Sequence, residues 1–178
     1  NEPIISGRTE KMSKSKKNVV DPQKIIDSFG ADTARFFMLS DSPPDRDMEW
    51  SESGVDGSWR FLNKLWKFVH SLEVIKKEEN LPSELSDQNK ELLVSLNFAI
   101  EEITKSIESF SFNIAVASIR TLFNHLVSYK AKTDNDKSIL LFVTNKLLIM
   151  INPMVPHIAE ELWKTLNNEG LVCNANWP

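Results

Sequence analysis

Cysteine and glycine are scarce in this sequence. A single cysteine, Cys173, among 178 residues excludes an internal disulfide framework and a zinc site built on cysteines. Only five glycines argue against glycine-rich phosphate loops and turn-rich β folds. The longest apolar stretch, residues 139–150, is too short for a membrane span and contains Thr144, Asn145 and Lys146. With 41% hydrophobic and 26% charged residues, the chain has the composition of a globular domain with a buried core.

Net positive charge is confined to the start of the chain. The whole sequence carries −4, but residues 1–20 hold five basic and two acidic side chains, a net charge of +3. The remaining residues therefore carry −7. This acidic body excludes a polybasic nucleic-acid binder of high isoelectric point. We therefore expect any anion site to be local, within residues 8–17.

Helix signals begin after the basic segment. Asp21 and Pro22 predict the start of a short helix, because Asp accepts from free backbone N–H groups and Pro suits the first helical position. Gly30 is placed to end that helix. Asp32 is expected to cap a second short helix. Two prolines predict a loop over residues 40–44.

Long apolar stripes of helical period follow. They predict helices over residues 51–75, 92–110, 114–129 and 138–151, and a short last helix over residues 158–166. Short connections favour antiparallel neighbours. We therefore predict a mainly α fold with two parts: a loop and connecting-helix segment over residues 1–50, and an antiparallel helix bundle with an extended tail over residues 51–178.

The candidate for chemistry is residues 11–15, which read Lys-Met-Ser-Lys-Ser. Lysine carries a compact charge on a flexible stem, which suits a polyphosphate and can stabilise charge that develops on phosphate oxygens. Charge alone favours a solvated basic loop or a targeting patch. A Walker A loop is excluded, because Gly7 has no second glycine five residues on. With four lysines close together and no apolar stripe to bury, residues 7–18 are expected to be the least anchored part of the chain.

Residues 7–22 closely resemble the second ATP motif of the class I aminoacyl-tRNA synthetases, and the five-residue core matches the family pattern at every position. Residues 30–35 also look like the family's. Residues 152–163 resemble the end of the family's anticodon-binding bundle. The likeness to the leucyl branch, of bacterial type, is carried by residues 40–44, 49–51 and 54–63.

This resemblance implies an enzyme that activates leucine with ATP, releases pyrophosphate and passes leucine to tRNA(Leu). It implies that Lys14 and Lys11 are catalytic and bind the ATP phosphates, with Lys14 as the main contact to the leaving pyrophosphate. Ser13 and Ser15 are implied as further phosphate ligands. It also implies ATP as a substrate with Mg as its counter-ion, no permanently bound cofactor, no protein-held metal and no membrane contact. The implied enzyme is monomeric and cytoplasmic.

The family's first ATP motif is not found in this sequence. That motif resembles His-x-Gly-His, and none of the three histidines, His70, His125 and His157, stands in such a pattern. No alternating β-α pattern for a nucleotide-binding sheet is present either. We therefore expect a fragment that is inactive by itself, with the loop at the end of a catalytic region and the bundle after it. The alternatives are a valyl- or isoleucyl-type synthetase fragment, or a non-catalytic helical interaction module.

Three tryptophans lie at core-like helical spacing, so Trp59, Trp66 and Trp163 are expected in the core rather than stacked on bases. His157 follows a proline at a helix start, and we expect it to be buried or to cap that helix.

Several charged residues are expected to be solvated. Glu160 and Glu161 are adjacent, point about 100° apart on a helix, and make a poor catalytic pair. Arg60, Lys64 and Lys67 run down one flank of a helix. We take them as a solvated face, with contact to an RNA backbone as the alternative.

Overall fold

The computed structural model describes residues 10–73 and 85–178. Within these ranges the chain forms seven α-helices, one 3-10 helix and no β-strand. The helices are α1 (Pro22–Phe29), α2 (Ala31–Asp41), α3 (Glu52–His70), α4 (Asp87–Glu108), α5 (Phe112–Ser128), α6 (Asp134–Ile151), α7 (Pro156–Thr165) and η1 (Val172–Asn174). The predicted mainly α fold is confirmed. Most of the expected connection between α3 and α4 lies outside the described residues.

The first two helices meet at a glycine. The Asp21 carboxylate accepts from the backbone N–H of Gln23 at 3.0 Å, and Pro22 takes the first helical position. Gly30 has a φ of 85°, in the region that favours glycine because it carries no Cβ. Its N–H donates to the Ile26 carbonyl at 2.8 Å and ends α1. Both predictions for the ends of this helix are confirmed.

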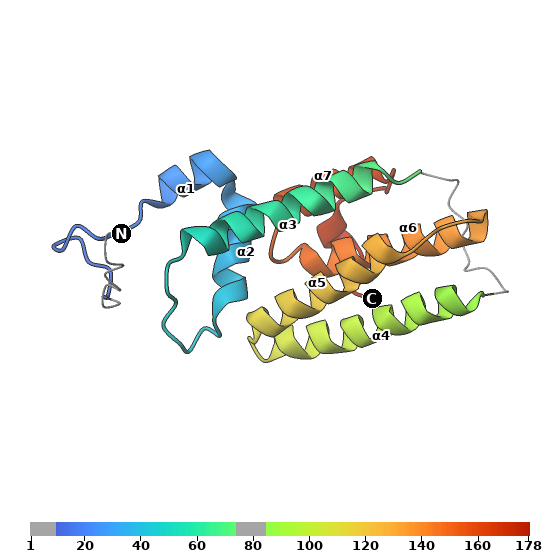
Figure 1. Cartoon of the computed structure of the whole chain (residues 1–178), viewed down its shortest axis with the longest axis horizontal. Helices are drawn as coiled ribbons and strands as arrows, with labels where there is room; N and C mark the ends of the chain where they lie inside the picture. The colour runs from blue at the N-terminus through green and yellow to red at the C-terminus, as the bar shows by residue number, and fades with distance from the viewer. Residues whose placement is uncertain (1–9, 74–84) are drawn as a thin grey trace, which may run out of the picture.

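The four long helices, α3 to α6, form an antiparallel bundle in which successive helices alternate in direction (Figure 1). Helix α6 is apolar nearly all round, and nine of its residues are buried. It packs against α4, α5 and α7, which makes it the central helix. It begins with a capping box, in which Thr133 and Asp136 each bond to the other's backbone N–H.

Helix α2 lies across the bundle and packs against α3 and α5 (Figure 1). Phe36 of α2 is fully buried and stacks on Phe61 of α3, with ring centres 5.0 Å apart. The connecting segment therefore contributes to the same hydrophobic core as the bundle. The proposed boundary between residues 50 and 51 stays a prediction.

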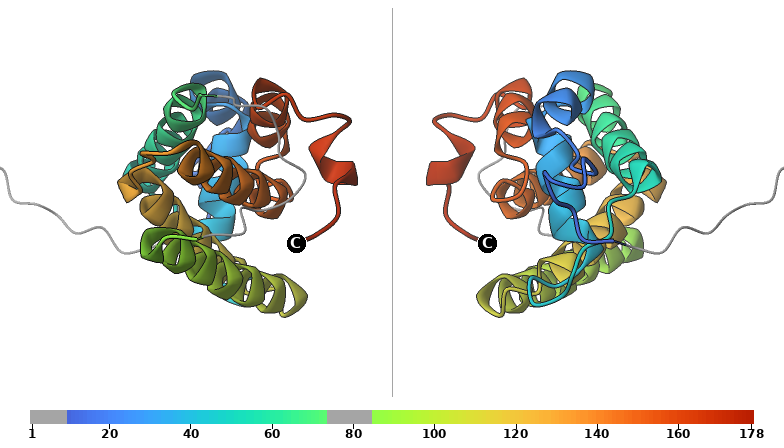
Figure 2. Two further views of the ribbon diagram at one scale, coloured as in Figure 1. Left: turned by 90° about the vertical axis from the view of Figure 1, so that its right-hand side faces the viewer. Right: turned by 90° about the vertical axis from the view of Figure 1, so that its left-hand side faces the viewer.

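The C-terminal tail folds back over the bundle (Figure 2). It contains the 3-10 turn η1, whose Val172 is buried. The indole N–H of Trp177 donates to the Thr104 hydroxyl of α4 at 2.8 Å. The expectation of a wholly extended tail missed this turn, because the burial that stabilises it comes from distant helices.

Candidate functional site

The lysine-rich loop, residues 10–18, projects away from the bundle and joins it through α1 (Figure 1). A tight turn reverses the chain, in which the Lys16 N–H donates to the Ser13 carbonyl at 3.1 Å. Lys17 then takes a φ of 54°. The Asn18 side chain closes the loop by accepting from the Ser13 N–H at 2.8 Å. These hydrogen bonds all lie within the loop, in keeping with the expectation that it is weakly anchored.

The structure brings the four predicted site residues together on this loop. Lys11, Lys14 and Ser15 are exposed, and Ser13 is half-buried. The hydroxyl oxygens of Ser13 and Ser15 lie 2.6 Å apart in a hydrogen bond. The arrangement thus presents ammonium groups and hydroxyl groups on one short, accessible segment. Their roles in catalysis and phosphate binding stay predictions.

Lysine charges on this loop differ in their surroundings. Lys16 forms an ion pair with Glu10 at 3.0 Å, which offsets its charge. Among the described residues, no carboxylate forms an ion pair with Lys11 or Lys14. The same is true of Lys17, so the charges of Lys11, Lys14 and Lys17 are not offset by a described carboxylate and can attract an external anion.

The basic residues Arg60, Lys64 and Lys67 are all exposed along one side of α3, as predicted for a solvated face. Arg60 forms an ion pair with Asp56 one turn earlier. The Lys64 ammonium lies 5.7 Å from the centre of the Phe123 ring. Since Phe123 belongs to α5, the Lys64 side chain reaches across from one helix to the other.

The prediction that all three tryptophans belong to the core was wrong for two of them. Trp163 is 8% exposed, but Trp59 is 41% and Trp66 38% exposed. Trp59 packs edge-to-face with Phe29 of α1, with ring centres 6.4 Å apart, and Trp66 stacks on His70 with ring centres 4.3 Å apart. Helical spacing places Trp59 and Trp66 on one side of α3, but neighbouring side chains cover only part of that side.

Asp32 does not cap its own helix, and that prediction was wrong. It is 9% exposed, and its carboxylate accepts from the Ile158 backbone N–H at 2.7 Å. It also bonds to His157 Nδ1 at 2.8 Å. Asp32 therefore caps the N-terminus of α7 from another helix. The Arg35 guanidinium strengthens the junction by donating to the Met154 carbonyl at 2.9 Å.

His157 is not buried, contrary to one of the two expectations for it, because its side chain is 76% exposed. It does lie at the start of α7, where it bonds to the capping carboxylate. The expectation of a solvated pair failed for Glu160, whose Oε2 accepts from the Val172 N–H at 3.0 Å. Glu161 is exposed and pairs with Lys164 at 3.2 Å. The folded tail covers one carboxylate and leaves the other in solvent.

Arg120 received no role from the sequence, yet it is a prominent residue of the structure. Its guanidinium lies over the rings of Phe36 at 5.3 Å and Phe61 at 5.1 Å. Burial lowers the pKa of Arg120, because desolvation disfavours the charged form. The available sequence signal was an arginine four residues after Val116, within the apolar stripe of α5. Arg120 and Val116 line a cavity of about 380 Å³ between α2, α3 and α5.

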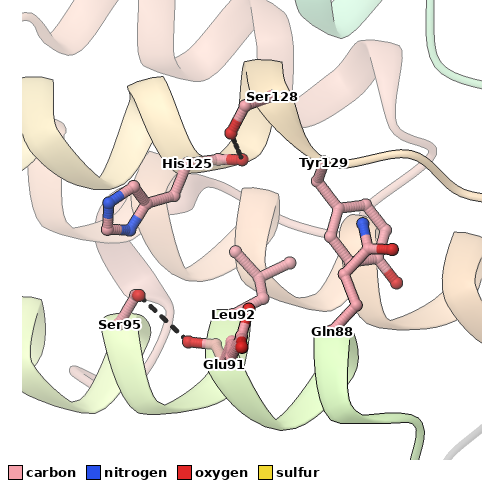
Figure 3. Close-up of a pocket in the computed structure, with 7 residues that line it drawn as sticks. All are labelled: Gln88, Glu91, Leu92, Ser95, His125, Ser128 and Tyr129. Atoms are coloured by element: carbon pink, nitrogen blue, oxygen red, sulfur yellow. Dashed lines mark hydrogen bonds between the residues drawn. The ribbon is translucent and has the colours of Figure 1, made fainter.

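A second cavity, of about 300 Å³, lies between α4 and α5 (Figure 3). The Ser95 and Ser128 hydroxyls in its lining both donate to carbonyls of their own helices, those of Glu91 and His125. These two hydroxyls thus already have partners within the chain. Both hydroxyls bond to backbone carbonyls rather than to the His125 ring, so the described lining shows no nucleophile paired with a base.

Residues 10–73 and 85–178 contain no group of three or more side chains able to hold a metal ion. No described helix is long and apolar enough to cross a membrane.

Family models match both parts of the chain. Residues 89–178 match the anticodon-binding domain of tRNA ligase. Residues 3–51, which include the lysine-rich loop, match the tRNA synthetases class I (I, L, M and V).

Similar proteins carry the name leucine–tRNA ligase. The relative from Paramagnetospirillum magneticum is 46% identical over 176 residues, and that from Rhodospirillum rubrum is 41% identical over 178 residues. Each alignment covers 99% of this chain, but only 20% and 21% of the relative. The chain therefore spans about a fifth of the length of these relatives.

Solved structures show the same helical arrangement. A leucyl-tRNA synthetase of Agrobacterium radiobacter K84, in a ternary complex with tRNA and LeuAMS, matches with a TM-score of 0.79 at 26% identity. That match covers 94% of this chain and 22% of the synthetase. Methionyl-tRNA synthetase of Mycobacterium tuberculosis, in complex with methionyl-adenylate, shares the fold with a TM-score of 0.68 at 20% identity, over 85% of this chain and 34% of that protein. Because a family model covers half of the chain and the fold agrees, the chain belongs to the family of the anticodon-binding domain of tRNA ligase.

Proposed function

We propose that this chain is part of a leucine–tRNA ligase that activates leucine with ATP and transfers it to tRNA(Leu). The observation that carries the proposal is the sequence identity of 41–46% to leucine–tRNA ligases over 99% of the chain. Valyl and isoleucyl synthetases share the class I motif but are not favoured by that similarity. Residues 1–50 are proposed as the end of the catalytic region, and residues 51–178 as the tRNA-contacting bundle. The proposed enzyme is monomeric and cytoplasmic.

The chemistry proposed for the loop concerns the leaving pyrophosphate. In adenylate formation, a leucine carboxylate oxygen attacks the α-phosphorus of ATP, and the bond from that phosphorus to the bridging oxygen of the β-phosphate breaks. Negative charge then grows on the pyrophosphate, which a positioned ammonium stabilises. Lys14 is assigned as the main contact, with Lys11, Ser13 and Ser15 as further ligands. Mg²⁺ accompanies ATP as its counter-ion.

The loop geometry supports this assignment in two ways. Lys14 and Lys11 are exposed and form no ion pair with the described carboxylates, so their charge is not offset locally. The loop is also bonded chiefly to itself, so it is free to approach a ligand held elsewhere in a larger enzyme. Segments that close on a ligand are drawn from weakly anchored regions.

The test uses the complete ligase that contains this chain. Lys14→Ala is expected to lower leucine-dependent ATP–pyrophosphate exchange about 100-fold or more, the usual effect of losing one preorganised donor. Lys16→Ala is the matched control, because it removes the same charge from the same loop but Lys16 already pairs with Glu10. Near-normal exchange by Lys14→Ala, or equal losses in both variants, contradicts the assigned role. Absence of leucine-dependent exchange in the unmodified ligase contradicts the proposed function itself.

A further inference from the structure

The cavity between α2, α3 and α5 collects buried polar atoms that have no hydrogen-bond partner. Ser58 Oγ, Asn113 Oδ1 and Arg120 Nε all belong to residues that line it, and each is sealed from solvent without a partner. Ser58 is only 1% exposed. Buried polar groups are nearly always hydrogen-bonded, so three exceptions around one cavity point to a group that binds there.

The chemistry of the lining defines what that group must offer. Arg120 Nε only donates, Asn113 Oδ1 only accepts, and the Ser58 hydroxyl does either. Asp41 adds a carboxylate to the lining, so the cavity holds one positive and one negative charge. A bare anion is therefore poorly matched. A neutral hydroxyl, which donates and accepts at once, satisfies the unpartnered atoms.

The basic side of α3 lies next to this cavity. Gly57 lines it, and Arg60 and Lys64 follow three and seven residues later, on the same side of the helix. The Lys64 ammonium reaches over Phe123 of α5, the helix that also supplies Arg120. Exposed basic side chains thus flank a cavity suited to a hydroxyl. A ribose between two phosphates presents that combination of groups, and the 2′-hydroxyl is specific to RNA.

We propose that this cavity binds a ribose of a bound RNA strand, with its 2′-hydroxyl between Asn113 and Arg120. The flanking phosphates lie on Arg60 and Lys64. The proposal rests on the proposed function for its RNA, the tRNA. The volume of about 380 Å³ lies within the range of small-molecule pockets. These three polar atoms have almost no accessible surface in the structure, so binding requires rotamer changes of Ser58, Asn113 and Arg120 that turn them toward the bound hydroxyl.

The experiment measures binding of the 178-residue chain to a tRNA(Leu) transcript and to the same RNA with every 2′-hydroxyl methylated. Methylation keeps the phosphates but removes the hydroxyl donors. The unmodified protein is expected to prefer the unmodified RNA. Asn113→Leu removes the acceptor, and Gly57→Leu fills the cavity; a Cβ at Gly57 meets no atom within 4 Å. Each variant is expected to reduce the preference about fivefold, the size of one hydrogen bond.

Lys64→Ala is the matched control. It is expected to weaken binding of both RNAs equally and to lower the salt dependence, because it removes a phosphate contact and no hydroxyl contact. Thermal unfolding of each variant establishes that it is folded, and Gly57→Leu provides a test that leaves all three polar side chains in place.

An unchanged preference in folded Gly57→Leu overturns the inference and leaves the proposed function standing. That result assigns the cavity to a protein segment or to packing. Failure of the unmodified chain to bind tRNA overturns both the inference and the proposed role of the bundle.

Discussion

Replacing Gly54 by alanine tests how closely α2 approaches α3. An ideal Cβ at Gly54 lies 2.5 Å from Cε2 and 3.1 Å from Cδ2 of Phe37, well inside the contact distance of about 3.5–4.0 Å between carbon atoms. Phe37 is 2% exposed, and its ring meets the edge of Trp50 at 5.2 Å. The ring therefore has little room to move away, and α2 must shift or strain.

Two opposing terms set the magnitude of this effect. Alanine is favoured over glycine inside a helix by about 1 kcal/mol. Overpacking a well-packed core costs about 1–3 kcal/mol. Since the overlap involves a buried ring rather than a flexible chain end, the second term is expected to win. The difference between the two terms predicts that Gly54→Ala lowers the free energy of unfolding by up to about 2 kcal/mol.

Gly57→Ala is the matched control, one turn further along α3. No atom lies within 4 Å of its added Cβ, so only the helix-propensity gain remains, about 0.5–1 kcal/mol of stabilisation. Urea unfolding of the 178-residue chain, followed by circular dichroism, measures both variants against the unmodified protein. The two are expected to change stability in opposite directions. Equal stabilisation by both refutes the close approach of Phe37 to α3.

Two further predictions concern carboxylates. Asp32→Ala should lower the free energy of unfolding by about 2–3 kcal/mol, because α7 loses its N-terminal cap and a hydrogen bond to a buried carboxylate. Asp27→Ala is the control: its carboxylate accepts from a side chain on the exposed surface of α1, so urea unfolding should show a much smaller loss. Equal losses in the two variants refute the argument. The backbone N–H of Lys132 is the main cause that lowers the pKa of Asp136 to about 2. Since this pKa is depressed in the folded state, the stabilisation by Asp136 is complete above about pH 4 and is lost as pH falls toward 2. Asp136→Asn should therefore be less stable than the unmodified protein at pH 7, and this difference in the free energy of unfolding should shrink between pH 4 and pH 2. A difference that stays constant from pH 7 to pH 2 contradicts the assignment.

The sequence by itself determined the features that depend on neighbouring residues. Asp21 and Pro22 start α1, and Gly30 ends it at a φ of 85°, because capping and left-handed backbone geometry are local properties. The apolar stripes of the long helices were readable for the same reason. The lysine-rich loop was readable as a candidate phosphate site, since its residues are consecutive and its resemblance lies in that order.

The tertiary structure decided which surfaces meet. Asp32 bonds to Ile158, 126 residues away, and no local pattern specifies that partner. Trp59 and Trp66 lie on the side of α3 that receives little cover, although their spacing fits a core helix equally well. Arg120 stands within an apolar stripe whose meaning depends on the helices that pack beside it. Periodicity tells which residues share a side of a helix, but only the packing of distant elements decides whether that side is buried, exposed or hollowed into a polar cavity.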